Sequence, residues 1–256
     1  MAFTEAAQPQ VALVREVIEI KMRMDDAEDQ LLCVHLKEIL SIYESRKAER
    51  ERLNRKTSYQ FNPLRRIPIH EPTHSRVLGD LLDPRGSHGQ GDLFLQEFLR
   101  RIGHANPRSG SWQVTVETGH VDICLWRTVP ASVVIIENKS NWAIDQQQQL
   151  YRYWFQNIYR NYPELDYDDT AVAADFKVVY LAPSEHKRPE PQSLSRPPDL
   201  IDVPGLPDKM PLEPMSFTLD GHLPAWFAEC VSQLDSENER LRHFLKLYQE
   251  IWSPTL

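Results

Sequence analysis

Three segments rich in β-forming residues follow one another between residues 112 and 137 of the chain. They cover residues 112–118, 121–126 and 133–137, and the turn residues Gly119 and Pro130 separate them. Short runs of Val, Ile, Thr and Trp bounded by such residues predict β-strands. Three consecutive strands therefore constrain the fold more than any other feature of the sequence.

Helical segments flank this run of strands. Thr73 begins a predicted helix over residues 73–83, a second is expected at 93–102, a third at 144–159, and a fourth strand at 177–181. The order is αβββαβ, and a mixed sheet of this kind must be covered by the helices around it. We therefore expect an α/β fold.

The remaining segments are predicted to extend this core. Residues 9–52 contain no internal proline or glycine and predict one or two long helices, whereas residues 183–214 hold nine of the 19 prolines and predict an irregular loop. A short strand near residues 216–219 and two helices, roughly at residues 224–234 and 238–251, are expected near the C-terminus. The predicted organisation is an N-terminal helical extension (1–60), a core (61–182), a proline-rich loop (183–214) and C-terminal elements that pack on the core (215–256).

Composition narrows the class of protein. The chain has 256 residues, three cysteines and a net charge of -8, and no apolar run approaches the ~18 residues of a membrane span. The first ten residues lack the pattern of a secretory signal, so we expect a cytoplasmic protein without a membrane partner. The cysteines are widely spaced, which gives no indication of a zinc site.

The negative charge is unevenly distributed. Residues 46–66 contain eight basic side chains and two acidic ones, a net charge of +6, while the rest of the chain carries -14. A basic segment can contact nucleic-acid phosphates, and a solvated helix end is the alternative interpretation. The candidate nucleic-acid-binding residues are Arg50, Arg52, Arg55, Lys56, Arg65 and Arg66.

The second and third strands carry a group of charged residues. If VDICLW and VVIIENK form an antiparallel hairpin that turns at Val129-Pro130, residues that face each other have numbers summing to 259. Asp122 then lies opposite Glu137, and Lys139 shares their face because side chains alternate along a strand. Two close carboxylates repel each other unless a cation lies between them.

These three groups together predict a hydrolytic site. Mg²⁺ prefers carboxylate oxygens, and a lysine beside it could position or deprotonate water and offset charge on a phosphoryl oxygen. The expected cofactor is Mg²⁺ or Mn²⁺. The alternative is a plain salt bridge at the open end of the hairpin, although apolar neighbours such as Val133 and Ile136 make an uncompensated acid costly there.

At these residues the sequence resembles the PD-(D/E)XK nuclease superfamily. The segments HEPTHSRVLGDLLDPRGSHGQGDLFLQEFL, VETGHVDICLW, VVIIENK and QLYRY are similar to a bacterial family of uncharacterised PD-(D/E)XK proteins, over roughly residues 60–182. The resemblance implies a restriction-endonuclease-like core, metal ligation by Asp122, Glu137 and the backbone carbonyl of Asn138, and a catalytic role for Lys139. Val121 stands where the name-giving proline would be.

Five further residues are candidates for supporting roles. Some relatives carry an acid or a histidine where Glu71 and His74 begin the first core helix, and the alternative is a charge that stabilises the helix dipole. Glu117 could add a third acid or be an ordinary residue at the hairpin end. Gln149 and Tyr153 match the Q-x-x-x-Y pattern of exonuclease-like branches, and the alternative is a solvated glutamine face with Tyr153 in the core.

The resemblance implies a metal-dependent nuclease that hydrolyses phosphodiester bonds, and the expected substrate is DNA rather than RNA. A role in defence against foreign DNA follows from the family alone. Two other hypotheses stay open: a non-catalytic nucleic-acid-binding or interaction module on the same fold, and an RNase or nuclease toxin. The N-terminal helices could form a homodimer or recruit a partner protein.

Overall fold

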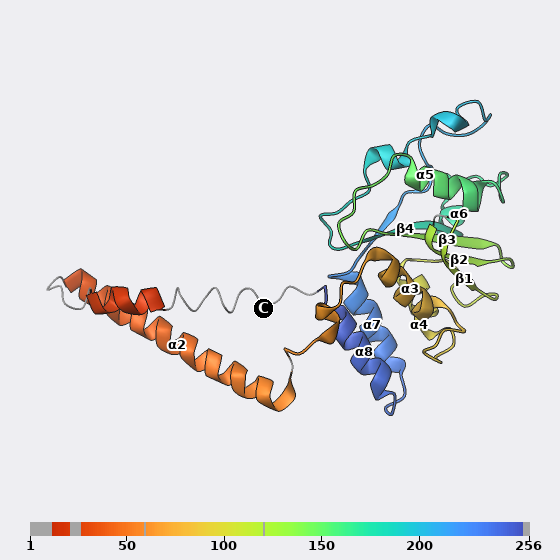
Figure 1. Cartoon of the computed structure of the whole chain (residues 1–256). Coiled ribbons are helices and arrows are strands. Elements are labelled where there is room, and N and C mark those ends of the chain that lie inside the picture. Colours follow the sequence, from red (N-terminus) through yellow and green to blue (C-terminus); the bar gives the residue numbers. More distant parts are fainter. Residues whose placement is uncertain (1–11, 21–26, 59, 120, 253–256) are drawn as a thin grey trace. The chain divides into compact units, whose positions relative to one another are not determined.

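The computed structural model describes residues 12–20, 27–58, 60–119 and 121–252. The chain divides into two compact units, Met1–Asn62 and Pro63–Leu256. Figure 1 shows both units, coloured along the sequence. No helix among the described residues combines the length and apolar character that a membrane span requires.

A five-stranded mixed sheet forms the centre of the second unit. Its strands lie in chain order, with antiparallel pairing of β1, β2 and β3 and parallel pairing of β3, β4 and β5. They are β1 (Gln113–Thr118), β2 (Val121–Arg127), β3 (Ser132–Asn138), β4 (Phe176–Ala182) and β5 (Met215–Thr218). The predicted α/β class and mixed sheet are confirmed.

The register of the β2–β3 hairpin is the predicted one. Ile123 pairs with Ile136 and Arg127 pairs with Ser132, so the paired residue numbers sum to 259. Continued by one residue, the register brings Asp122 opposite Glu137. The same register buries Ile123 and Ile136 on one face of the sheet and leaves Asp122 and Glu137 on the other.

Helices from both ends of the second unit cover the first face of the sheet. They pack around a core in which Phe94 and Trp226 are fully buried, and the indole of Trp226 donates a hydrogen bond of 2.9 Å to the carbonyl of Phe94. The helices are α3 (Glu71–Leu82), α4 (Leu93–Arg101), α7 (His222–Gln233) and α8 (Glu239–Gln249). In Figure 1, α3, α4, α7 and α8 lie together on one side of the strands, while α5 lies on the other.

Shorter elements cover the second face. Trp154 and Tyr180 are buried there among the side chains of β2, β3 and β4. The elements are α5 (Gln149–Trp154), the π-helical turn η2 (Phe155–Tyr159), α6 (Thr170–Asp175) and the 3-10 turns η3 (Pro191–Leu194) and η4 (Pro198–Leu200). The predicted helix over 144–159 was five residues too long at its start, because Gln148 takes a left-handed conformation with φ 55°.

The proline-rich segment contains only the short turns η3 and η4, and it is packed rather than loose. Leu194 and Met210 are buried against the second face. The guanidinium of Arg196 closes the segment on itself by donating hydrogen bonds to backbone carbonyls. The acceptors are Leu200, Ile201, Val203 and Leu206, at 2.6–3.0 Å.

The first unit contains two described helical stretches, residues 12–20 and α2 (Ala27–Thr57). The thiol of Cys33 lies 3.6 Å from the carbonyl oxygen of Ile18, and Arg15 pairs with Glu44. Two helical stretches are thus observed where one or two long helices were predicted over residues 9–52, and residues 9–11 and 21–26 lie outside the described residues. The second unit begins with a 3-10 turn, η1 (Pro63–Arg66).

Candidate active site

Asp122, Glu137 and Lys139 lie together at the open end of the β2–β3 hairpin. The ammonium of Lys139 is 2.7 Å from Oε1 of Glu137. Asp122 accepts a hydrogen bond of 2.7 Å from the backbone amide of Asn138 through Oδ2. The strand alternation that buries Ile136 on the opposite face brings these three side chains to the face that α5 covers.

Burial opposes the ionisation of both carboxyl groups, and Asp122 also opposes that of Glu137. Glu137 is 1% exposed, and burial followed by the negative charge of Asp122 raises its pKa to about 8, against the lowering effect of Lys139. Burial also raises the pKa of Asp122. Oε2 of Glu137 is buried without a hydrogen-bond partner. The pair thus holds one oxygen for which the protein supplies no donor.

Gln149 and Tyr153 extend this cluster from α5. Lys139 donates a hydrogen bond of 3.1 Å to Oε1 of Gln149, and the amide nitrogen of Gln149 donates one of 2.8 Å to the hydroxyl of Tyr153. All three residues are buried. The amide of Gln149 therefore bridges the lysine and the tyrosine.

Asp145 is a member of the cluster that the sequence did not reveal. Its Oδ1 lies 4.0 Å from the Lys139 ammonium and accepts a 2.7 Å hydrogen bond from the hydroxyl of Tyr180. Its Oδ2 accepts from the backbone amide of Glu190, also at 2.7 Å. Asp145 lies in the loop before α5. A loop has no regular alternation of side chains, so the sequence could not indicate which way the Asp145 side chain points.

The carboxylates fit a hard divalent cation. The ligand atoms they offer are all oxygen, and one of these oxygens is buried and unpaired. A cation would offset the burial that raises both pKa values and the charge of Asp122 that adds to the rise at Glu137. Within the described part of the chain, no three His, Cys, Asp or Glu side chains converge as a metal cluster. Two carboxylates with water and substrate oxygens are nevertheless a common Mg²⁺ environment.

Comparison with protein-family models identifies the family to which this fold belongs. The model of the PD-(D/E)XK nuclease superfamily matches residues 61–250. The chain belongs to this superfamily. Comparisons with curated proteins and with solved structures find no significant match. Superfamily membership supports a metal-dependent nuclease and leaves the substrate and the ion open.

In this PD-(D/E)XK chain, Glu71 lies beside the end of β3 and His74 does not. The backbone carbonyl of Glu71 accepts a 2.9 Å hydrogen bond from the side chain of Asn138. The side-chain Oε1 of Glu71 accepts one of 3.1 Å from the backbone amide of Asn141. His74 instead bonds to the hydroxyl of Tyr248 at 2.8 Å in the core between α3 and α8. Burial lowers the pKa of His74 to about 4. Glu71 thus lies near the carboxylate cluster and His74 lies in the core, although both were candidates for supporting roles at the site.

Glu117 lies at the level of the carboxylates but outside the buried cluster. The pairs Val116–Ile123 and Thr118–Val121 bracket it, so it faces Asp122 across β1 and β2. Its side chain is exposed and its φ is 54°. The pKa of Asp122 rises mainly through burial, and the charge of Glu117 adds to the rise.

The six basic candidates are divided between the two units. Arg50, Arg52, Arg55 and Lys56 lie on α2, where Arg52 pairs with Glu49 at 2.8 Å. Arg65 and Arg66 lie in η1, and Arg65 donates to the backbone carbonyl of Glu250. Their contact with nucleic acid stays a prediction.

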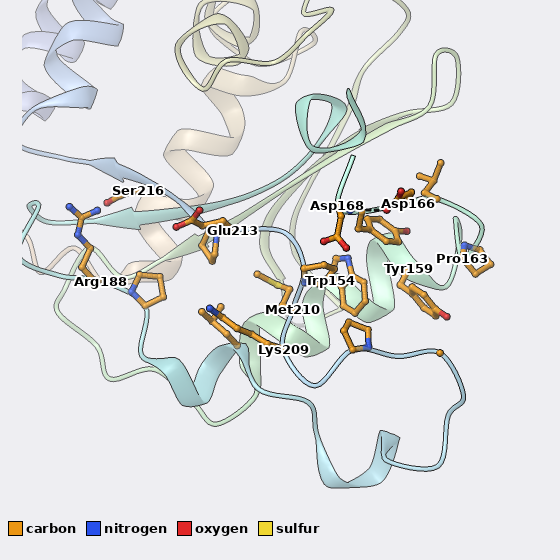
Figure 2. A pocket seen from close by; sticks show the side chains of 18 residues that line it. Trp154, Tyr159, Pro163, Asp166, Asp168, Arg188, Lys209, Met210, Glu213 and Ser216 are labelled. Atoms are coloured by element: carbon orange, nitrogen blue, oxygen red, sulfur yellow. Dashed lines mark hydrogen bonds between the residues drawn. The ribbon is translucent and has the colours of Figure 1, made fainter. Parts of the chain in front are cut away.

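A separate hollow of about 1000 Å³ lies against Trp154 of α5 and the proline-rich segment (Figure 2). Figure 2 shows Trp154 and Tyr159 on one side of it and Lys209 and Met210 on another. None of Asp122, Glu137 or Lys139 is among the described residues that line it. The hollow is therefore distinct from the carboxylate cluster.

Proposed function

We propose that this protein is a Mg²⁺- or Mn²⁺-dependent deoxyribonuclease whose active site consists of Asp122, Glu137 and Lys139. The observation that carries the proposal is the buried Glu137–Lys139 pair beside Asp122, with one carboxylate oxygen left without a donor. Burying such a set is costly unless a ligand completes it. Membership of the superfamily supports the nuclease activity.

In this proposal Asp122, Glu137 and the carbonyl of Asn138 hold the cation. A bound divalent cation lowers the pKa of water and neutralises charge on a phosphoryl group. An ammonium has three N–H groups that can donate hydrogen bonds. In Lys139 one of them points to Glu137 and another to Gln149. The remaining donor can bind the attacking water or a non-bridging phosphate oxygen, which stabilises the charge that develops during attack.

The residues around Lys139 fix its direction. Gln149 accepts a hydrogen bond from Lys139, and Gln149 is itself fixed by the hydrogen bond that it donates to the hydroxyl of Tyr153. Glu71 holds the loop after β3 through the amide of Asn141. These contacts keep the lysine and the carboxylates oriented before substrate arrives, which lowers the cost of reorganisation in the transition state.

DNA is the substrate that we expect, and a defence role against foreign DNA accompanies it. Both follow from the family resemblance. The basic residues of α2 and η1 supply phosphate contacts, which position nucleic acid without reading its sequence. A homodimer or a partner protein at the N-terminal helices belongs to the same hypothesis, as does a cytoplasmic location.

A cleavage assay tests this proposal. Purified protein is incubated with linear, circular and single-stranded DNA and with RNA, with Mg²⁺, with Mn²⁺ or with EDTA. Glu137→Ala and Lys139→Ala are expected to abolish cleavage. Glu185→Ala and Lys187→Ala are matched controls, because the same acid-x-Lys spacing recurs in the proline-rich segment, where Glu185 is exposed and Lys187 is half-buried. Both are expected to keep full activity.

Three results would overturn all or part of the proposal. Cleavage that survives EDTA, or persists in both Glu137→Ala and Lys139→Ala, removes the site assignment. Salt-sensitive binding of nucleic acid without cleavage of any substrate favours the non-catalytic module. Cleavage of RNA alone replaces the deoxyribonuclease by an RNase or toxin.

A further inference from the structure

Helix α2 carries a second apolar stripe in addition to the one it uses within its own unit. Cys33 and, half-buried, Leu36, Leu40 and Tyr43 form the first stripe, which includes the contact of Cys33 with Ile18. The second stripe is exposed and lies on a different face. Its members are Leu31, Leu32, Ile39, Ile42 and Leu53.

The exposed stripe follows the helix axis. Leu31, Ile42 and Leu53 are each eleven residues apart, which is close to three turns of α-helix, so they lie on nearly one line. Ile39 is 61% exposed and Ile42 is 54% exposed. Such a stripe on a 31-residue helix is the pattern by which helices associate.

The charges of α2 indicate what covers this stripe. Residues 27–44 carry four acids and one lysine, whereas residues 45–57 carry six basic side chains and two acids. A second α2 that runs in the opposite direction brings the acidic half of each helix against the basic half of the other. Parallel pairing would instead align like charges.

One antiparallel register satisfies both the apolar and the charged positions. If facing residues have numbers summing to 84, Leu31 meets Leu53 of the second copy and Ile42 meets itself on the two-fold axis. In the same register Glu38 meets Arg46. We propose that α2 is a homodimerisation helix that pairs antiparallel with α2 of a second copy of this chain in this register.

The first experiment tests the face. Sedimentation of the full chain is measured from nanomolar to high micromolar concentration. Wild type is expected to dimerise reversibly, and Ile39→Glu with Ile42→Glu is expected to raise the dimer Kd by about a hundred-fold, because two exposed apolar side chains per helix lose their burial. Ser41→Glu adds one negative charge per helix, against two in the double variant, at an exposed position outside the stripe and is expected to leave Kd unchanged.

The second experiment tests the direction and the register. Leu31→Cys and Leu53→Cys proteins are mixed under mild oxidation, and a disulfide heterodimer is expected only in the mixture, since Cys33, Cys124 and Cys230 are buried. Arg46→Glu is expected to weaken the dimer, and adding Glu38→Arg is expected to restore it. A parallel dimer would show neither the mixed disulfide nor the restoration.

Other outcomes overturn the proposal. A chain that stays monomeric at every concentration has no such interface, and its stripe is then covered within the chain or by a different protein. A dimer that Ile39→Glu with Ile42→Glu leaves intact uses another surface. Circular dichroism of each variant shows that α2 remains helical, so that a lost dimer reports on the interface.

Discussion

The carboxylate of Glu137 is held where its charge is only partly compensated. It is buried, it is close to Asp122, and Lys139 contacts only one of its two oxygens. Burial and the neighbouring acid raise its pKa to about 8. At the scale of a single residue, the buried Glu137 carboxylate thus lowers the stability of the metal-free protein.

Glu137→Gln is expected to stabilise the metal-free protein, and more at pH 8 than at pH 5. Between pH 4.5 and 8 the unfolded carboxyl is ionised while the folded one keeps its proton. The unfolded state then binds fewer protons, so the free energy of unfolding of wild type falls as pH rises through this window. The difference is roughly 4 kcal/mol at most, from ~1.4 kcal/mol per pKa unit.

Urea unfolding in EDTA at both pH values measures this difference. Glu185→Gln removes an exposed carboxylate and serves as the control. Equal pH slopes for wild type and Glu137→Gln would contradict the raised pKa. Under the proposed function, added Mg²⁺ stabilises wild type and has little effect on Glu137→Gln, because ligand binding to the folded state raises its stability.

Asp145→Asn is expected to lower kcat for DNA cleavage by about ten-fold with little change in KM. Asp145 faces Lys139 at 4.0 Å and is fixed by Tyr180 and Glu190, so under the proposed function it would act on the reaction by positioning the lysine. A loss of orientation acts on the transition state rather than on substrate binding. Single-turnover kinetics measure the effect.

The controls separate positioning from general destabilisation. Asp199→Asn changes an exposed acid that pairs with Arg152, and it is expected to leave kcat unchanged. Asp145→Glu restores the carboxylate and is expected to recover part of the rate. An equal loss in kcat for Asp145→Asn and Asp145→Glu would indicate a packing role only.

The sequence predicts the position of some of these residues and not of others for a physical reason. Asp122, Glu137 and Lys139 follow from the two-residue period of a strand and from one hairpin register, both of which the structure confirms. The direction of the Asp145 side chain depends on the geometry of its loop, which has no repeating pattern that a sequence could show. His74 shares a helix start with Glu71, but the rotation of α3 turns its ring toward α8.

At the scale of elements, the proline-rich segment acts as part of the second layer of the fold. It contains only short 3-10 turns, yet Ser193 is fully buried and its hydroxyl accepts a hydrogen bond from the amide of Leu150 in α5. Glu190 reaches Asp145 through its amide. A segment without regular hydrogen bonding is thus fixed by side-chain contacts to α5 and to its preceding loop.

Arg196→Ala is expected to loosen this segment and to destabilise the second unit by roughly 3 kcal/mol, because several backbone carbonyls, most of them part-buried, lose a charged donor. Thermal unfolding and limited proteolysis measure the change, with new cleavage expected within residues 195–208. Arg188→Ala removes an exposed arginine from the same segment and is the control. Unchanged proteolysis of Arg196→Ala would show that the segment is held without Arg196.

Long periodic elements were predictable, and short ones were not. The strands and the helices α3, α4, α7 and α8 have strong patterns that the structure reproduces within a few residues. The six-residue α6 and the late start of α5 escape prediction, since the left-handed Gln148 breaks a helix whose sequence, rich in glutamine, gives no stop signal. Tertiary contacts decide these cases.

At the scale of the whole molecule, the net charge of -8 conceals two kinds of surface. The acids are spread over the chain, whereas most of the basic segment lies on α2. Nucleic-acid affinity depends on local phosphate contacts, each of which releases a counterion. Total charge is therefore a poor guide to the partner of this protein.

The double variant Arg55→Ala with Lys56→Ala is expected to weaken DNA binding by the same factor for every DNA sequence. The plot of log K against log salt is expected to become less steep by roughly 1.8, or about 0.9 for each phosphate that the variant no longer neutralises. Fluorescence anisotropy in EDTA measures binding without cleavage. Lys187→Ala with Arg188→Ala removes the same charge elsewhere, and an equal effect of both pairs would mean that only overall charge matters.

The unpaired oxygen of Glu137 also has a consequence for evolution. Most proteins are only marginally stable, and selection retains a destabilising group only while it serves a function. A descendant of this chain that no longer needed its site would gain stability from a neutral replacement of similar size, such as glutamine, at position 137. Substitution there would be expected early in such a lineage, ahead of changes at the exposed Glu117.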